Sequence, residues 1–141
     1  MISDGMIPVD QPLHHVGIVQ PDEESVAAMM ATLGLTEDYR GYVPQFHALC
    51  IFTRAAGRSP IEFVVPDGGP LLKFNKGLGG LHHIALEVPD LAAIMAHFAE
   101  QGILMLEPEP VRGAGNFLCN FLRPSATRGI IVEYVQMLSE S

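Results

Sequence analysis

Basic side chains, cysteine and long apolar runs are all scarce in this chain of 141 residues, and tryptophan is absent. The 8 Lys and Arg stand against 16 Asp and Glu, and the formal charge of −8 disfavours binding to a phosphate backbone. The longest apolar stretches, such as residues 91–95, are too short to span a membrane. The opening segment MISDGMIPVD lacks the basic and apolar regions of a secretory signal. We therefore expect a cytoplasmic protein with neither nucleic acid nor membrane as a partner.

The two cysteines, Cys50 and Cys119, lie far apart and share no spacing typical of a metal site. This favours reduced thiols over a disulfide framework. The chain is nevertheless 48% hydrophobic and contains 14 Gly and 11 Pro, a composition typical of a turn-rich globular protein. Its length fits one ordinary domain, or two small halves that share a core.

A motif of ten residues occurs twice: LHHVGIVQPD at 13–22 and LHHIALEVPD at 81–90. The match extends beyond the motif, because Gly34 and Gly102 also correspond. In each copy the alternation of side chains predicts a β-strand, and the Pro-Asp pair predicts a helix start capped by the aspartate. Apolar residues at helical spacing then run as far as the glycine, which suits a left-handed helix end.

Three strand-like runs follow each predicted helix. They are residues 39–43, 47–53 and 61–65 in the first half, and 104–107, 117–122 and 130–136 in the second. We therefore predict an α+β fold in which two tandem βαβββ units form a curved mixed sheet around a metal site. The prediction is a single domain over 1–141, with units at 13–66 and 81–137 and a linker at 67–80.

The metal prediction comes from carboxylates in the last apolar strand of each half, Glu62 and Glu133. Burying a carboxylate without a counter-charge costs about 1–4 kcal/mol even in mild cases. Strand alternation sends one histidine of each pair, His15 and His83, to the face away from the helices, whereas His14 and His82 point toward them. A single buried histidine is usually a core residue. Two matched His–Glu sets instead favour a divalent ion, with Zn, Co, Ni, Mn and Fe as candidates.

Six short segments carry a resemblance to a known family. They are KF at 73–74, GGLHHIA at 79–85, EP at 109–110, GAG at 113–115, FLRP at 121–124 and GIIVE at 129–133. Their order and spacing resemble the vicinal oxygen chelate superfamily, which includes glyoxalase I, extradiol dioxygenases and antibiotic-resistance proteins, and within it the methylmalonyl-CoA epimerases. The resemblance covers almost the whole chain. It implies a glyoxalase-like fold with metal ligands at His15, Glu62, His83 and Glu133.

The resemblance implies a metal-dependent isomerase, epimerase or lyase that acts on a small carbonyl compound through an enolate, with an acyl-CoA thioester as one candidate substrate. The family's glutamate base is missing between Arg40 and Cys50, so Glu133 and His47 both stay open as the base. If Glu62 points away, the other three ligands form the two-histidine, one-carboxylate set of a non-haem Fe(II) dioxygenase. A third alternative is a ligand-binding or resistance protein without turnover. A homodimer is expected by analogy with the family.

Overall fold

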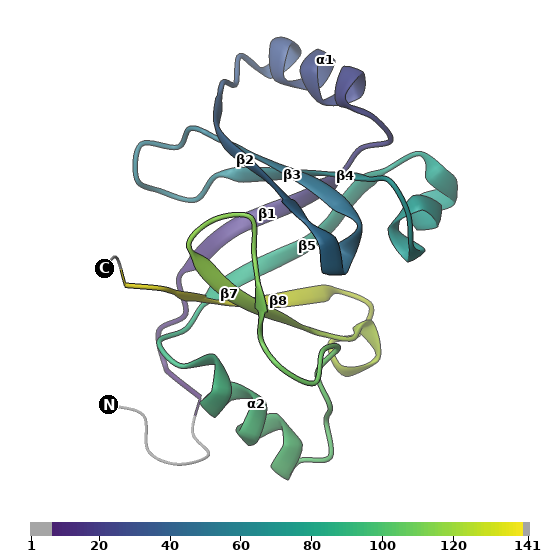
Figure 1. Cartoon of the computed structure of the whole chain (residues 1–141). Helices are drawn as coiled ribbons and strands as arrows, with labels where there is room; N and C mark the ends of the chain where they lie inside the picture. Colours follow the sequence, from purple (N-terminus) through teal and green to yellow (C-terminus); the bar gives the residue numbers. More distant parts are fainter. Residues whose placement is uncertain (1–6, 140–141) are drawn as a thin grey trace. The chain divides into compact units, whose positions relative to one another are not determined.

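The computed structural model describes residues 7–139, in two compact units (Figure 1). The first unit is His15–His82, and the second joins the residues up to His14 with those from His83 onward. Each unit has the β-α-β-β-β order, which confirms the predicted α+β, glyoxalase-like fold class. The grouping of both units into a single domain stays a prediction. Within the described residues, no helix is long and apolar enough to cross a membrane.

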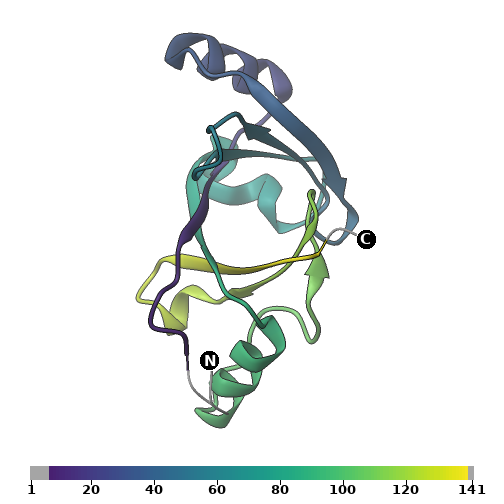
Figure 2. The same cartoon turned by 90° about the vertical axis from the view of Figure 1, so that its left-hand side faces the viewer.

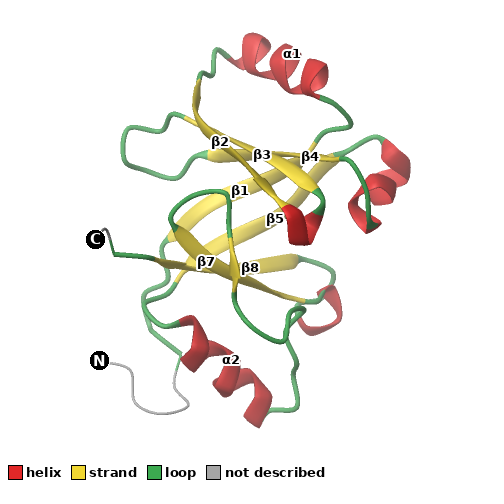
Figure 3. Cartoon of the chain, viewed as in Figure 1, coloured by secondary structure: helices red, strands yellow, loops and turns green. Residues whose placement is uncertain are grey.

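The first unit is built on a four-stranded mixed sheet in the order β2-β3-β4-β1. Strands β1 and β4 run parallel, and the other neighbours are antiparallel. The elements are β1 (Leu13–Val19), α1 (Glu23–Leu33), β2 (Glu37–Val43), the short helical turn η1 (Pro44–Phe46), β3 (Ala48–Thr53), β4 (Ile61–Pro66) and η2 (Pro70–Gly77). Figure 3 shows α1 beside these strands and the short turns at the ends of the strands.

Helix α1 begins and ends where the sequence predicts. The Asp22 carboxylate accepts a hydrogen bond from the Ser25 N–H at 2.8 Å, and Gly34 ends the helix with a φ of 71°. One sheet face packs against α1 through a core that includes Val26, Ile51 and Phe63. Because side chains alternate along a strand, the opposite face carries the next residue on each strand. That opposite face, which we call the ligand face, holds the predicted metal ligands of the unit.

The second unit repeats this plan in the strand order β5-β8-β7-β6. Its elements are β5 (Gly80–Glu87), α2 (Leu91–Glu100), β6 (Val111–Arg112), β7 (Phe117–Leu122), η3 (Pro124–Ala126) and β8 (Ile131–Met137). Asp90 caps α2 by accepting a hydrogen bond from the Ala93 N–H at 3.2 Å. Helix α2, seen from another side in Figure 2, packs against the unit's sheet through a core that includes Leu91, Leu122 and Tyr134.

The predicted strand at 104–107 is wrong, and the second strand of this unit is instead the short β6. At Glu107, the last residue of this segment, a side chain makes the backbone hydrogen bonds that a neighbouring strand would otherwise provide. Asn120 accepts a hydrogen bond from the Glu107 N–H at 3.0 Å and donates one to the Glu107 carbonyl at 2.9 Å. Two prolines follow, at 108 and 110, and neither has an N–H to offer a strand neighbour.

Candidate functional site

In the first unit, the parallel strands β1 and β4 bring His15 and Glu62 together. Gly17 pairs with Glu62, and His15 lies two residues before Gly17, on the same face of β1. The Nε2 atom of His15 lies 3.2 Å from Oε1 of Glu62, and the two side chains are 0% and 9% exposed. The carboxylate that looked anomalous in an apolar strand therefore has a buried imidazole as its partner.

The second unit forms the same pair from the equivalent strands, β5 and β8. Ala85 lies opposite Glu133, which places His83 one same-face position earlier. The His83 Nε2 and Glu133 Oε1 atoms are 2.9 Å apart, and the side chains are 3% and 4% exposed. Each unit thus closes its own His–Glu pair between its first and last strands.

A phenylalanine supports each pair from the neighbouring strand. Phe52 on β3 lies opposite Glu62, and its ring meets the His15 ring edge-on, with centroids 5.3 Å apart at 84°. Phe121 on β7 lies opposite the second unit's glutamate and meets that unit's histidine at 5.7 Å and 90°. Edge-to-face packing of this kind favours one orientation of the imidazole ring. The sequence interpretation missed this role, although the repeated spacing CIF at 50–52 and CNF at 119–121 was visible.

The two cysteines also occupy equivalent places. Cys50 lies opposite Val64 and Cys119 opposite Val135, so both thiols are on the ligand face of their unit, two residues before the phenylalanine. They are 3% and 1% exposed and form no disulfide with each other. This agrees with the prediction of free thiols.

Buried His15, Glu62, His83 and Glu133 are side chains of the kind that could hold a metal ion. An imidazole nitrogen and a carboxylate oxygen are ordinary ligands for Zn²⁺ and other divalent transition metals. Each unit presents one of each, side by side and shielded from water. The chemistry of the donors therefore fits a divalent ion.

Tyr39 extends the aromatic contacts of the first unit. Its ring stacks on Phe52 with centroids 4.7 Å apart and planes 10° from parallel. Burial, followed by the negative charge of Glu62, raises the pKa of Tyr39 to about 12. The phenol is therefore protonated at neutral pH.

His47, one of the two predicted bases, lies at the turn between η1 and β3. It is exposed, its φ is 51°, and its N–H donates to the Pro44 carbonyl at 3.2 Å. Ala48 pairs with Pro66 whereas Glu62 pairs with Phe52. These pairings are four residues apart on β3, a separation of about 13 Å. Within the first unit, His47 is thus not beside the His–Glu pair.

The other polar residues singled out from the sequence make local contacts. Arg40 forms ion pairs with Glu37 at 2.7 Å and with Glu23 of α1 at 2.8 Å, so it ties β2 to the helix. The His14 ring lies 5.2 Å from the Phe117 ring, and the His82 ring lies 4.9 Å from that of Phe74.

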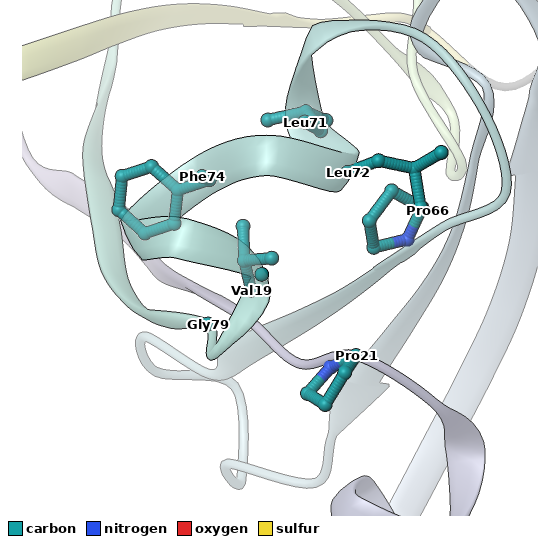
Figure 4. Close-up of a pocket in the computed structure, with 8 residues that line it drawn as sticks. Val19, Pro21, Pro66, Leu71, Leu72, Phe74 and Gly79 are labelled. Carbon is teal, nitrogen blue, oxygen red and sulfur yellow. The ribbon is translucent and has the colours of Figure 1, made fainter.

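A small apolar pocket lies under η2 in the first unit (Figure 4). Its volume is about 70 Å³, and its lining includes Val19 from β1, Pro66 from β4 and Phe74 from η2. Val19 and Pro66 each lie four residues beyond a member of the His15–Glu62 pair, or about 13 Å along the strand.

Two βαβββ units, each with a buried His–Glu pair between its first and last strands, define a glyoxalase-like protein with candidate metal ligands. The family model described as glyoxalase/bleomycin resistance protein/dioxygenase superfamily matches residues 14–121, and the chain belongs to this superfamily.

Among known relatives, the ethylmalonyl-CoA/methylmalonyl-CoA epimerase of Cereibacter sphaeroides is 33% identical, with 89% of this chain and 97% of the relative covered. The mitochondrial methylmalonyl-CoA epimerase of Homo sapiens is 32% identical, with 88% and 73% covered. Among solved structures, a variant of the Streptomyces coelicolor methylmalonyl-CoA epimerase in complex with 2-nitronate-propionyl-CoA superposes with a TM-score of 0.80. It is 24% identical, and 91% of this chain and 98% of that one are covered. At that identity the likeness shows a shared fold.

Proposed function

We propose that this protein is a divalent-metal-dependent epimerase of an acyl-CoA thioester, with methylmalonyl-CoA as the first substrate to test. The observation that carries the proposal is the duplicated, buried His–Glu pair in a chain whose relatives are epimerases. The ligands in the proposal are His15, Glu62, His83 and Glu133.

The burial of the pairs supports a metal over a purely structural role. A buried carboxylate is costly, and replacing a buried ion pair by apolar side chains is often neutral or stabilising. Burying two such pairs at equivalent places therefore costs free energy that the fold itself does not require. Binding of a metal ion would account for both pairs. A divalent ion held by these residues would supply Lewis-acid chemistry, which would polarise the thioester carbonyl and stabilise negative charge on its oxygen.

The protein's own part in the reaction is to move the proton. In the proposal, a carboxylate oxygen of Glu133 accepts the α proton of the thioester, and the electron pair of the broken C–H bond enters the enolate. A proton from solvent water then adds to the opposite face of the α carbon and restores the C–H bond with inverted configuration, and Glu133 releases the first proton to solvent. Of the two predicted bases, His47 is the weaker candidate because it lies at the exposed turn, about 13 Å along the sheet from the row of Glu62.

The apolar pocket under η2 supports a substrate with an extended, partly apolar arm. Val19 and Pro66 in its lining lie on the same strands as the His15–Glu62 pair and alternate to the same face. Binding energy from such a non-reacting part of a substrate can be used to orient the reacting carbon.

The two alternatives are less well supported. A non-haem Fe(II) dioxygenase requires Glu62 to stand outside the ligand set, yet Glu62 contacts its histidine just as Glu133 contacts its own. A binding protein without turnover gives no reason for two buried carboxylates. The homodimer and the cytoplasmic location stay predictions, and sedimentation velocity would measure the first.

The test is metal-dependent loss of the α proton. The protein is stripped with a chelator, reloaded in turn with Co²⁺, Zn²⁺, Ni²⁺, Mn²⁺ or Fe²⁺, and incubated with one epimer of methylmalonyl-CoA in D₂O. We expect deuterium at the α carbon and equilibration of the two epimers only in the reloaded samples. Glu133→Gln should abolish both. Glu100→Gln, which changes an exposed glutamate at the end of α2 in the same unit, should leave them within about twofold.

Other results would point elsewhere. Oxygen uptake with Fe²⁺ and an aromatic diol would support the dioxygenase. Tight binding of the thioester without exchange in any metal form would support the binder.

A further inference from the structure

The ligand face of the first unit carries a transverse row of four residues, one from each strand. The register aligns Tyr39 on β2 with Phe52 on β3, Phe52 with Glu62 on β4, and Glu62 with Gly17 on β1. The row therefore runs from a phenol, through a stacked ring, to the glutamate of the His–Glu pair. Gly17, which has no side chain, stands at the other end of the row.

An irregularity in β2 turns Tyr39 toward this face. Glu37 pairs with Thr53 and Tyr39 pairs with Phe52, so β2 contains one more residue than β3 between these two pairs, as in a β-bulge. The extra residue, Asp38, puts Glu37 and Tyr39 on opposite faces. Glu37 therefore reaches Arg40, and Tyr39 lies on the ligand face. Bulges that re-aim a side chain are enriched next to active sites.

The second unit has no counterpart of this phenol. Its equivalent row contains Phe121, Glu133 and Ala85, and the backbone beyond Phe121 is the irregular segment at Leu106. The duplication thus preserved the pair and its supporting ring in both units, but the hydroxyl occurs in one. A ring alone would provide the stacking, so the stacking does not account for the hydroxyl.

The hydroxyl of Tyr39 also takes no part in the hydrogen bonding of the described residues. In the part of the chain that the structure describes, it makes no hydrogen bond, whereas the Tyr42 hydroxyl donates to the Asp67 carboxylate at 3.0 Å. Tyr134 makes none either among the described residues, but it is buried in the core against α2. Of the three tyrosines, only Tyr39 combines an uncommitted hydroxyl with a position on the ligand face.

We propose that the Tyr39 hydroxyl donates a hydrogen bond to the thioester substrate. In the row of four residues, Tyr39 lies at the end opposite Gly17. The proposal rests on the proposed epimerase function and adds a catalytic residue to it. The donor acts on the oxygens on which negative charge develops as the α proton leaves, so its contribution is larger in the transition state than in the bound substrate. The stack on Phe52 holds the phenol in place before the substrate arrives.

The test uses Tyr39→Phe, which removes one oxygen and keeps the stacked ring. The matched controls are Tyr134→Phe and Tyr42→Phe, which remove the other two hydroxyls away from the ligand face. For the metal-loaded proteins, kcat and KM are measured with methylmalonyl-CoA, and the dissociation constant is measured for 2-nitronate-propionyl-CoA. Metal content and urea midpoint are measured for each variant.

We expect Tyr39→Phe to lower kcat about 100-fold, the scale seen when one donor to a developing oxyanion is removed. KM, metal content and midpoint should change little, while the nitronate thioester binds more weakly. Both controls should stay within about twofold of the parent protein.

Unchanged kcat and nitronate affinity in Tyr39→Phe would overturn the assignment while leaving the epimerase function standing. A loss of metal content or stability in Tyr39→Phe equal to the loss of activity would also overturn it, because the residue would then act only on the fold. If the parent protein neither exchanges the α proton nor binds the nitronate thioester, the epimerase function fails and this role fails with it.

Discussion

Phe52→Leu, compared with Phe63→Leu, tests whether an aromatic ring orients His15, one of the proposed metal ligands. Both rings are 0% exposed and lie in the first unit, but they face opposite sides of its sheet. Phe52 contacts the rings of His15 and Tyr39. Phe63 belongs to the core against α1 and makes no aromatic pair among the residues described. The two substitutions therefore remove similar volumes from different surroundings.

The magnitudes follow from those contacts. Replacing a buried phenylalanine by leucine should lower the free energy of unfolding by about 1–2 kcal/mol through lost packing. Each aromatic pair is worth about 0.5–1.5 kcal/mol more. Phe52→Leu breaks two such pairs, so we expect a total loss of about 2–5 kcal/mol, against about 1–2 kcal/mol for Phe63→Leu. The pair with His15 involves a proposed metal ligand, and its loss should weaken Co²⁺ binding about 2-fold to 12-fold.

The assay has two parts. Urea denaturation of the metal-free proteins gives the stability change, and competition with a chromophoric chelator gives the Co²⁺ affinity of the folded proteins. Phe121→Leu should weaken Co²⁺ binding in the same way, because its ring meets His83 in the same geometry. Equal Co²⁺ affinities in the parent protein and in Phe52→Leu would refute an orienting role. So would an equal weakening by Phe63→Leu, which would reduce the effect to general stability.

Three further predictions concern the turn at Gly79, the phenol and the metal. Gly79→Ala should destabilise the protein by about 2–4 kcal/mol in urea denaturation, because φ is +80° and the added methyl would overlap the Val19 carbonyl. Gly77→Ala, with a φ of +82° but only an ordinary contact of 3.6 Å to the Leu72 carbonyl oxygen, should cost only about 1 kcal/mol. The raised pKa of Tyr39 means that the folded protein binds this proton more tightly than the unfolded chain does, so the resulting stabilisation is complete below pH 10 and is lost as pH rises toward 12. Between pH 9 and pH 11, the free energy of unfolding in urea should therefore fall less for Tyr39→Phe than for the parent protein. Removing the metal should lower the free energy of unfolding by about 2.7 kcal/mol relative to protein with metal at 100 times its Kd, and equal midpoints with and without chelator would contradict metal binding.

The sequence predicted the parts of the fold that depend on local patterns. The repeat at 13–22 and 81–90 located both first strands, and Asp22 and Asp90 located both helix starts, because alternation and capping act within a few residues. The pairing of Glu62 with His15 could be inferred only because the same anomaly occurred twice.

The failures involve contacts between segments distant in sequence. Residues 104–107 have the composition of a strand, but the side chain of Asn120, which is distant in the sequence, bonds to the backbone of Glu107. The bulge that turns Tyr39 toward the ligand face is likewise set by its pairing with β3. A bulge of one residue reverses the face of every side chain before it, so strict alternation could not have assigned Glu37 and Tyr39 together.

The parallel pairing of the first and last strands has a consequence for the order of folding. In each unit the histidine comes from the first strand and the glutamate from the last, so nearly the whole unit must be synthesised and folded before the two residues meet. Such non-local contacts form slowly, because the loop between them must close first. Neither His–Glu pair can therefore serve as an early nucleus. A metal ion that requires the assembled pairs would be taken up late, after both units have closed, and its rate of uptake during refolding would report that final step.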